Sequence, residues 1–173
     1  MRNILSQCSK GVTLADHVEL MEEIIQNFPS DISRLHSTYP LYSYTCVPYA
    51  LKLVADKQYE FIRGLPPRNV FAGKDFVEWL IRKGYLIEIA QETVQIGDWV
   101  IYSDDCGVFT HIGAFRAQGL VASKWGDLGL YEHKTFFVPS EYGINLKCYR
   151  SEPKEVTLAW FLEYAREFGI ELA

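Results

Sequence analysis

The chain has 173 residues, of which 49% are hydrophobic and 23% charged, with a net charge of -5 and a pI near 5.4. This length suits one globular domain and is too short for two. The acidic charge argues against nucleic acid as a partner, because nucleic-acid binders usually carry a basic face. No stretch reaches the roughly 20 apolar residues of a membrane span, and residues 1–17 lack the apolar core of a secretory signal. We therefore expect a cytoplasmic protein, or one delivered elsewhere without its own signal peptide.

Helical periodicity predicts the first element. Thr13 lies three positions before Asp16 in a capping-box-like start, and apolar side chains follow at helical spacing. This pattern predicts a helix from about Leu14 to Asn27. Residues 29–40 are polar and bounded by prolines, which predicts a connection.

The segment 46–62, "CVPYALKLVADKQYEFI", again has helical spacing. Pro48 is compatible with a helix only in its first turn, so Cys46 lies at, or one residue before, a helix start. Residues 63–73 have the composition of a loop. Residues 74–85 then place apolar side chains on one stripe and predict a helix that ends at Gly84.

From residue 96 the hydrophobic pattern changes to a period of two. Five short segments rich in aromatic and β-branched residues, separated by turn residues, predict an antiparallel meander. They cover residues 96–104, 109–117, 119–126, 130–139 and 144–150. Residues 155–169 return to helical spacing and predict a last helix that packs on the sheet. The predicted fold class is therefore α+β, with helices and strands segregated along the chain.

The four cysteines are single and widely spaced, which favours reduced thiols over a disulfide framework. A lone cysteine is most often a buried core residue, and we interpret Cys8, Cys106 and Cys148 in this way. Cys46 differs because a helix start offers unpaired N–H groups and a positive dipole end, both of which stabilise a thiolate.

His111 lies later in the chain, inside the predicted strand "FTHIGAF". A thiol on a helix that faces an imidazole on a strand is the arrangement used in nucleophilic thiol catalysis, where imidazole takes the thiol proton. The backbone N–H of Cys46 and the side chain of Tyr44 are candidates to hold the oxyanion. Without Cys46, His111 would be interpreted as a core histidine.

The strand after His111 carries the candidates for a third group. A three-residue loop places Ser123 on the face of His111, whereas a two-residue loop places Lys124 there. A serine can accept a hydrogen bond from imidazole and an ammonium group cannot, which favours Ser123, its carbonyl or a residue from elsewhere. Lys124 and Trp125 either pack against the sheet or line a substrate groove.

The run Asp104-Asp105-Cys106 precedes His111 and raises the question of a metal site. Its spacing fits no tetrahedral zinc pattern, and a hairpin turn between two strands is the simpler interpretation. We predict no metal and no cofactor.

The order of the motifs resembles a known superfamily. The Cys46 helix, "GDWVIY", "THIGAF", a tight turn and a further strand are similar to the papain-like fold in its permuted NlpC/P60 and CHAP form. The stretches "YTCVPYAL", "SKWGDLGLYEH" and "VPSEYG" resemble a bacterial branch of that superfamily with an S-K-[LW]-G signature. The likeness covers about residues 40–150, with flanking helices outside it, and implies one papain-like domain over residues 1–173.

The resemblance also implies an activity. It points to a cysteine hydrolase of an amide, isopeptide or related acyl bond in a peptide or amide-containing substrate, with Cys46 as nucleophile and His111 as base. His133 falls in the signature of the narrower branch, where it is a candidate third group or substrate contact. Both a cell-wall-type amidase and a delivered bacterial effector agree with this chemistry.

Two alternatives remain open. Thr45 precedes Cys46 where NlpC/P60 proteins usually carry an acidic residue, and Ser123 stands in the place of their third residue. A non-catalytic papain-like module that binds a protein partner is therefore the second hypothesis. An acyltransferase would use the same Cys46 and His111 pair and differ only in the acceptor.

Overall fold

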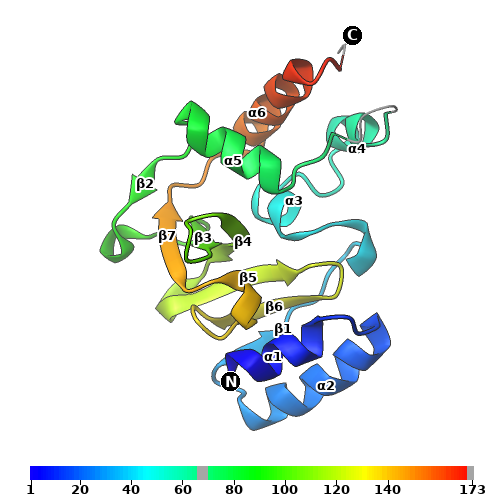
Figure 1. Ribbon diagram of the computed structural model, residues 1–173, viewed down its shortest axis with the longest axis vertical. Helices are drawn as coiled ribbons and strands as arrows, with labels where there is room; N and C mark the ends of the chain where they lie inside the picture. Colours follow the sequence, from blue (N-terminus) through cyan, green and yellow to red (C-terminus); the bar gives the residue numbers. More distant parts are fainter. Residues whose placement is uncertain (66–69, 171–173) are drawn as a thin grey trace.

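The computed structural model describes residues 1–65 and 70–170 and shows one mixed arrangement of helices and strands (Figure 1). The helices are α1 (Arg2–Ser9), α2 (Leu14–Asn27), α3 (Cys46–Ala50), α4 (Lys57–Arg63), α5 (Lys74–Lys83) and α6 (Lys154–Glu167). The strands are β1 (Ile32–Arg34), β2 (Glu88–Ile89), β3 (Trp99–Ser103), β4 (Phe109–Phe115), β5 (Leu120–Trp125), β6 (Gly129–Lys134) and β7 (Asn145–Tyr149). The α+β class predicted from the sequence is confirmed.

The described strands form one antiparallel sheet of seven strands in the order β1-β6-β5-β4-β3-β7-β2. The predicted meander is confirmed for β3 to β6. The prediction that the fifth strand extends it is wrong, because β7 crosses back and pairs with β3. The predicted strand number is also too low. The edge strands β1 and β2 have three and two residues, too few to show a period of two.

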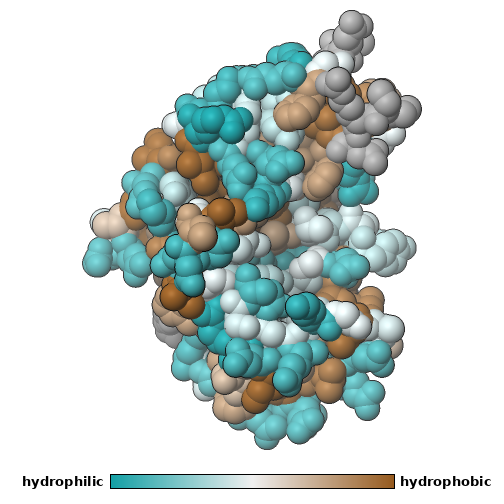
Figure 2. All heavy atoms as spheres, in the orientation of Figure 1, coloured by the Kyte–Doolittle hydropathy of each residue, from teal (hydrophilic) through white to brown (hydrophobic). Residues whose placement is uncertain are grey.

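The sheet separates two hydrophobic cores. On one face, Trp99, Ile101 and Ile112 pack with side chains of α3, α4, α5 and α6. On the other, Val100 and Val121 belong to a cluster with residues of α1 and α2. Figure 1 shows α1 and α2 at the opposite end of the molecule from α5 and α6. On the face shown in Figure 2, hydrophobic patches are scattered among hydrophilic side chains.

The predicted helices at 14–27, 74–83 and 155–169 are confirmed as α2, α5 and α6. The hydroxyl of Thr13 accepts a hydrogen bond from the Asp16 N–H and caps α2. Gly84 ends α5 with a φ of 73°, a left-handed conformation that favours glycine. The N-terminal helix α1 was not predicted from its pattern, and residues 66–69 of the predicted 63–73 loop lie outside the described residues.

The predicted helix over 46–62 is broken into α3 and α4. Lys52 and Ala55 both have a φ of 60°, so the backbone leaves the right-handed helical conformation at these two residues. The Asp56 carboxylate then accepts hydrogen bonds from the N–H groups of Gln58 and Tyr59 and starts α4. The predicted helix rested on the spacing of Ala50, Leu51, Val54 and Ala55, of which Ala50 and Leu51 are buried and Ala55 is exposed in the turn.

The contact between β4 and β5 is short and unusually close. The two strands pair at Ala114 with Ala122 and at Phe115 with Val121. A Cβ added to Gly113 would overlap Val121 Cγ1 and lie 3.0 Å from Cβ of Ser123. Only glycine fits at this position, which gives a packing reason for the glycine of "HIG". Beyond Gly113, toward His111, the β4–β5 pairing ends.

We predict that Gly113→Ala lowers the free energy of unfolding by about 2–3 kcal/mol, because the added methyl group pushes β4 away from β5. Urea unfolding measures this change. Gly64→Ala is the matched control, since its Cβ would meet only the carbonyl oxygens of Glu60 and Phe61 at 3.5 Å. We expect the control to stay within about 0.5 kcal/mol of wild type. Equal losses in both variants would contradict the close-packing explanation.

Candidate functional site

Cys46 is the first residue of α3 and is partly buried. α3 packs against β4 and β5, and the Cys46 thiol interacts with the backbone of Ile112, the neighbour of His111. Because β4 pairs with β5 only at Ala114 and Phe115, the Ile112 backbone has no partner in β5. The helix start therefore meets β4 where its pairing with β5 has ended.

Burial is the strongest influence on the Cys46 thiol and raises its pKa to about 11. Two other influences lower this pKa because they favour the thiolate. They are the charge of Lys124 and the backbone N–H groups of Ile112, Cys46 and Val47. The sequence-based expectation of a thiolate stabilised by the helix start is thus outweighed by desolvation. At pH 7, Cys46 is a neutral thiol.

His111 is 1% exposed and its Nε2 is buried without a hydrogen-bond partner. Its ring stacks on Tyr142, with the ring centroids 3.8 Å apart. Burial, followed by the charge of His133, lowers the pKa of His111 well below 6.5, so the imidazole is neutral. In the described part of the chain, no hydrogen bond joins His111 to Cys46.

Tyr142 stacks on His111 and is influenced by the charge of Cys46. It was not identified as a site residue from the sequence. Burial and then the charge of Cys46 raise its pKa well above 10, which places Tyr142 within electrostatic reach of the thiol. The only sequence signal was its place in the "VPSEYG" stretch. The loop that carries it is held by α1, since the Arg2 guanidinium donates hydrogen bonds to the carbonyls of Val138, Pro139 and Gly143.

Ser123 lies on the face of His111, as the three-residue-loop alternative predicts, because Val121 pairs with Phe115. Its hydroxyl is nevertheless 2.8 Å from Nε2 of His133 and accepts a hydrogen bond from the Trp125 indole N–H at 3.1 Å. His133 Nδ1 is 2.9 Å from the carbonyl oxygen of Lys134, which can only accept. Nδ1 therefore carries the hydrogen and Nε2 accepts from Ser123, so Ser123 orients His133 and makes no hydrogen bond to His111.

Lys124 points to the opposite face of the sheet from Ser123 and is buried. Its Nζ donates to the carbonyl of Gly126 at 2.8 Å and lies 5.2 Å from the ring centroid of Tyr44. Burial lowers the pKa of Lys124 to about 8, against the charges of Asp127 and Cys46. The Tyr44 hydroxyl is 2.5 Å from Ser37 Oγ, and no hydrogen bond from it to Cys46 is formed among the described residues.

Trp125 does not line a groove, because its side chain is fully buried in the core cluster of Tyr131 and Val121. Two cavities instead share Tyr44 as a lining residue. One of about 400 Å³ includes Thr45 and Pro48, close neighbours of Cys46. The other, of about 410 Å³, includes Tyr49 and Arg116, and Arg116 was not identified from the sequence because it comes from a separate segment.

The predicted hairpin turn at residues 104–108 is confirmed. The Asp104 carboxylate accepts hydrogen bonds from the N–H groups of Cys106 and Val108, both at 2.9 Å. Cys8 and Cys148 are buried as expected, but the core interpretation of Cys106 is wrong, because this residue is exposed on the turn.

Residues 1–65 and 70–170 contain no group of three or more His, Cys, Asp or Glu side chains placed to hold a metal ion. None of the described helices is both long and apolar enough to cross a membrane.

Comparison of the chain with protein-family models, curated proteins and solved structures gave no match. The papain-like resemblance of the sequence therefore stays a prediction, and the function has to be argued from the site itself.

The buried histidines predict a loss of stability in acid. Burial lowers the pKa of His133 to about 4 in the folded protein. Between pH 6.5 and pH 4, His133 is therefore protonated in the unfolded chain and neutral in the folded one. Stability is present above pH 6.5 and falls below it, by about 2 kcal/mol between pH 7 and pH 5 from His133 alone. Urea unfolding at several pH values tests this, and His133→Gln should flatten the slope. An unchanged slope in this variant would contradict the assignment.

The charge of Lys124 predicts an effect on Cys46. Because this charge favours the thiolate, Lys124→Met should raise the pKa of Cys46 further and slow its alkylation by iodoacetamide severalfold at pH 7. Peptide mass spectrometry measures the rate at Cys46, with Cys106 as the internal reference. Lys147→Met, which removes an exposed lysine of β7, should leave both rates unchanged. An equal Cys46 rate in wild type and Lys124→Met would exclude this coupling.

Proposed function

We propose that this protein is a cysteine-dependent acyl hydrolase or acyltransferase, with Cys46 as the nucleophile and His111 as the base. One observation carries the proposal. The Cys46 thiol interacts with the backbone of Ile112, and the next residue, His111, is a buried imidazole with an unpartnered Nε2. General-base activation requires an unfilled acceptor that can reach the thiol, and the open Nε2 of His111, one residue along β4 from the Ile112 backbone, supports this role.

The reaction starts from a neutral pair, since burial raises the pKa of the thiol and lowers that of the imidazole. As Sγ of Cys46 forms a bond to the substrate carbonyl carbon, the thiol proton moves to His111 and the carbonyl oxygen takes the negative charge. The bond to the leaving group then breaks, and His111 returns the proton to the departing nitrogen or oxygen. Cys46 is left as a thioester.

The second half of the reaction regenerates the thiol. His111 takes a proton from water or another acceptor as that acceptor attacks the thioester, and the proton then goes to the departing sulfur. The backbone N–H groups of Cys46, Val47 and Ile112, which favour a negative sulfur, are candidates to stabilise the oxyanion as well. The ammonium group of Lys124 adds a positive charge that acts on the Cys46 sulfur. Movement of His111 or Tyr142 toward Cys46 would complete the proton path.

The substrate class follows the papain-like resemblance of the sequence: an amide, isopeptide or related acyl bond. The cavity of about 400 Å³ is lined by Thr45 and Pro48, which flank Cys46 in the chain, and is large enough for part of a peptide or small amide, although Cys46 itself is not among its lining residues. Cell-wall-type amidase and effector roles both use this chemistry.

A non-catalytic binding module is the second candidate. It is favoured by the raised pKa of Cys46 and by the lack of a hydrogen bond between Cys46 and His111 in the described chain. In such a module, Cys46 is an ordinary buried thiol and His111 a packing residue of Tyr142.

Acylation by p-nitrophenyl acetate separates the two candidates. For the enzyme, we expect a burst of p-nitrophenolate and a hydroxylamine-sensitive acetyl group on Cys46, located by peptide mass spectrometry. His111→Gln should slow this acylation by about 100-fold or more, because it removes the general base. Cys46→Ser should abolish the burst.

Cys106→Ser is the matched control, since it removes an exposed thiol and should leave the burst unchanged. Urea unfolding of each variant confirms that the fold is retained. Acetylation of Cys46 no faster than that of Cys106, or equal rates in wild type and His111→Gln, would favour the binding module.

A further inference from the structure

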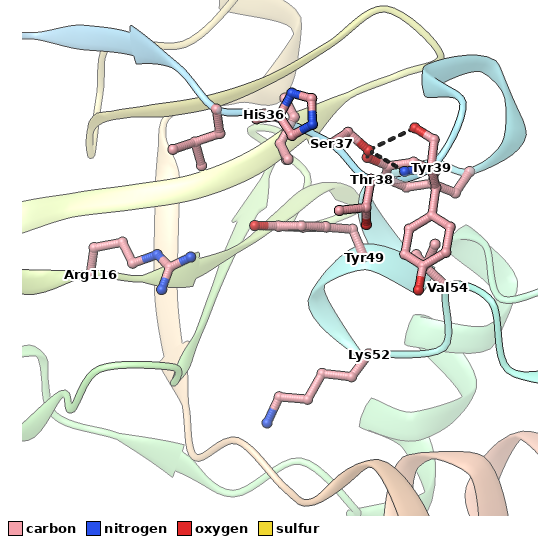
Figure 3. A pocket seen from close by; sticks show the side chains of 11 residues that line it. His36, Ser37, Thr38, Tyr39, Tyr49, Lys52, Val54 and Arg116 are labelled. Carbon is pink, nitrogen blue, oxygen red and sulfur yellow. Dashed lines mark hydrogen bonds between the residues drawn. The ribbon is translucent and has the colours of Figure 1, made fainter.

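The cavity of about 410 Å³ beside α3 combines a hydrophobic lining with positive charge (Figure 3). It is formed by the segment that follows β1, by α3 and the turn after it, and by the end of β4. Its lining residues are Leu35, His36, Ser37, Thr38, Tyr39, Tyr44, Tyr49, Lys52, Val54, Arg116 and Leu130. Its volume lies within the usual range for small-molecule sites, about 300–1,000 Å³.

Arg116 supplies the central charge. Its backbone N–H donates to the Leu120 carbonyl at 2.7 Å, which fixes the residue where β4 turns toward β5. In Figure 3 its guanidinium and the Tyr49 hydroxyl point toward one another. Burial raises the pKa of Tyr49, while the charge of Arg116 and a hydrogen bond from it act the other way.

The hydrogen bond to Tyr49 uses only part of the donor capacity of the Arg116 guanidinium. Its Nε is buried without a hydrogen-bond partner and forms an ion pair with the Glu132 carboxylate at 3.9 Å, a distance too long for a hydrogen bond. Among the described residues the guanidinium thus has no hydrogen-bonded carboxylate, and the terminal N–H groups of an arginine can form a paired hydrogen bond with a planar anion.

Two further basic side chains lie around Arg116 and Tyr49. Figure 3 shows Lys52 and His36 on opposite sides of them. Lys52 is exposed and is held at this position by a left-handed backbone with a φ of 60°. None of the described lining residues is acidic, although the chain as a whole carries a net charge of -5. The lining therefore carries the positive charges of Arg116 and Lys52, and Glu132, paired with Arg116, lies beside it.

The remaining lining is largely hydrophobic. Leu35, Val54 and Leu130 contribute aliphatic groups, and Tyr39 and Tyr44 contribute aromatic rings. This surface would bind an aryl or alkyl group, and the basic residues would bind an anion attached to it.

We propose that this cavity binds a hydrophobic carboxylate, with the carboxylate on Arg116, the charge of exposed Lys52 adding attraction, and the aryl or alkyl group against the hydrophobic lining. A carboxylate matches the two parallel N–H groups of one guanidinium. Phosphate sites usually add several backbone N–H groups from a helix start or glycine-rich loop, and the described lining includes no glycine. The ligand is either a free acid or the C-terminal residue of a peptide. The binding site does not depend on the proposed chemistry at Cys46.

Isothermal titration with 3-phenylpropionate and its neutral analogue 3-phenylpropanamide tests the proposal. We expect the acid to bind at least about tenfold more tightly than the amide, because only the acid pairs with the guanidinium. Arg116→Gln should weaken acid binding about tenfold and leave amide binding unchanged, and Arg116→Lys should fall between. Lys52→Gln should weaken the acid severalfold, whereas Lys57→Gln, an exposed lysine of α4 outside the cavity, should have no effect.

A second titration identifies the source of the carboxylate. Tighter binding of acetyl-Ala-Ala-Phe than of 3-phenylpropionate, lost when the peptide is amidated, would assign the site to a peptide C-terminus. The reverse order would assign it to a free acid. Equal affinities for acid and amide, wild-type affinity in Arg116→Gln, or tighter binding of inorganic phosphate than of the acid would overturn the proposal. Urea unfolding shows that each variant is folded.

Discussion

The close approach of Val121 to the bare backbone of Gly113 is the contact on which the site depends. It draws β4 and β5 together at one end, and pairing between them is confined to Ala114 and Phe115 of β4. Ile112 and His111 lie just beyond that pairing. The start of α3 can therefore bring its thiol to the backbone of β4 itself, which a continuous ladder of strand hydrogen bonds would prevent.

Desolvation, rather than local charge, sets the protonation of the residues around this contact. It overrides the N–H groups that favour a Cys46 thiolate, and it keeps His111 and His133 neutral. His17 shows how a buried imidazole is normally accommodated: its Nδ1 is 2.6 Å from the Cys8 carbonyl and its Nε2 is 2.8 Å from the Tyr131 hydroxyl. His133 is satisfied in the same way, at both nitrogens. The open Nε2 of His111 is thus a departure from the pattern of its neighbours, and an unmade hydrogen bond in a core is costly enough to call for a functional reason.

Sequence reasoning succeeded where one short-range rule decides the outcome. The Thr13 cap, the Gly84 stop and the face of Ser123 follow from local chemistry and strand alternation. Sequence reasoning failed where the structure depends on contacts between distant segments of the chain. The return of β7 to β3 depends on the whole sheet, and the edge strand β1 exists only because β6 pairs with it. The partners of Ser123 and the cavity around Arg116 likewise combine residues from several segments, and no spacing along the chain encodes them.

The bonds from α1 to the loop that holds Tyr142 have a consequence for the order of folding. Arg2 and Gly143 are separated by 141 residues, so their contact closes almost the entire chain into one loop. Such a closure is entropically costly and becomes favourable only after the intervening strands have assembled. During synthesis α1 emerges before residues 138–143, which make the surface that it binds. Docking of α1 therefore has to wait for residues 138–143, and its hold on the loop that carries Tyr142 forms only then.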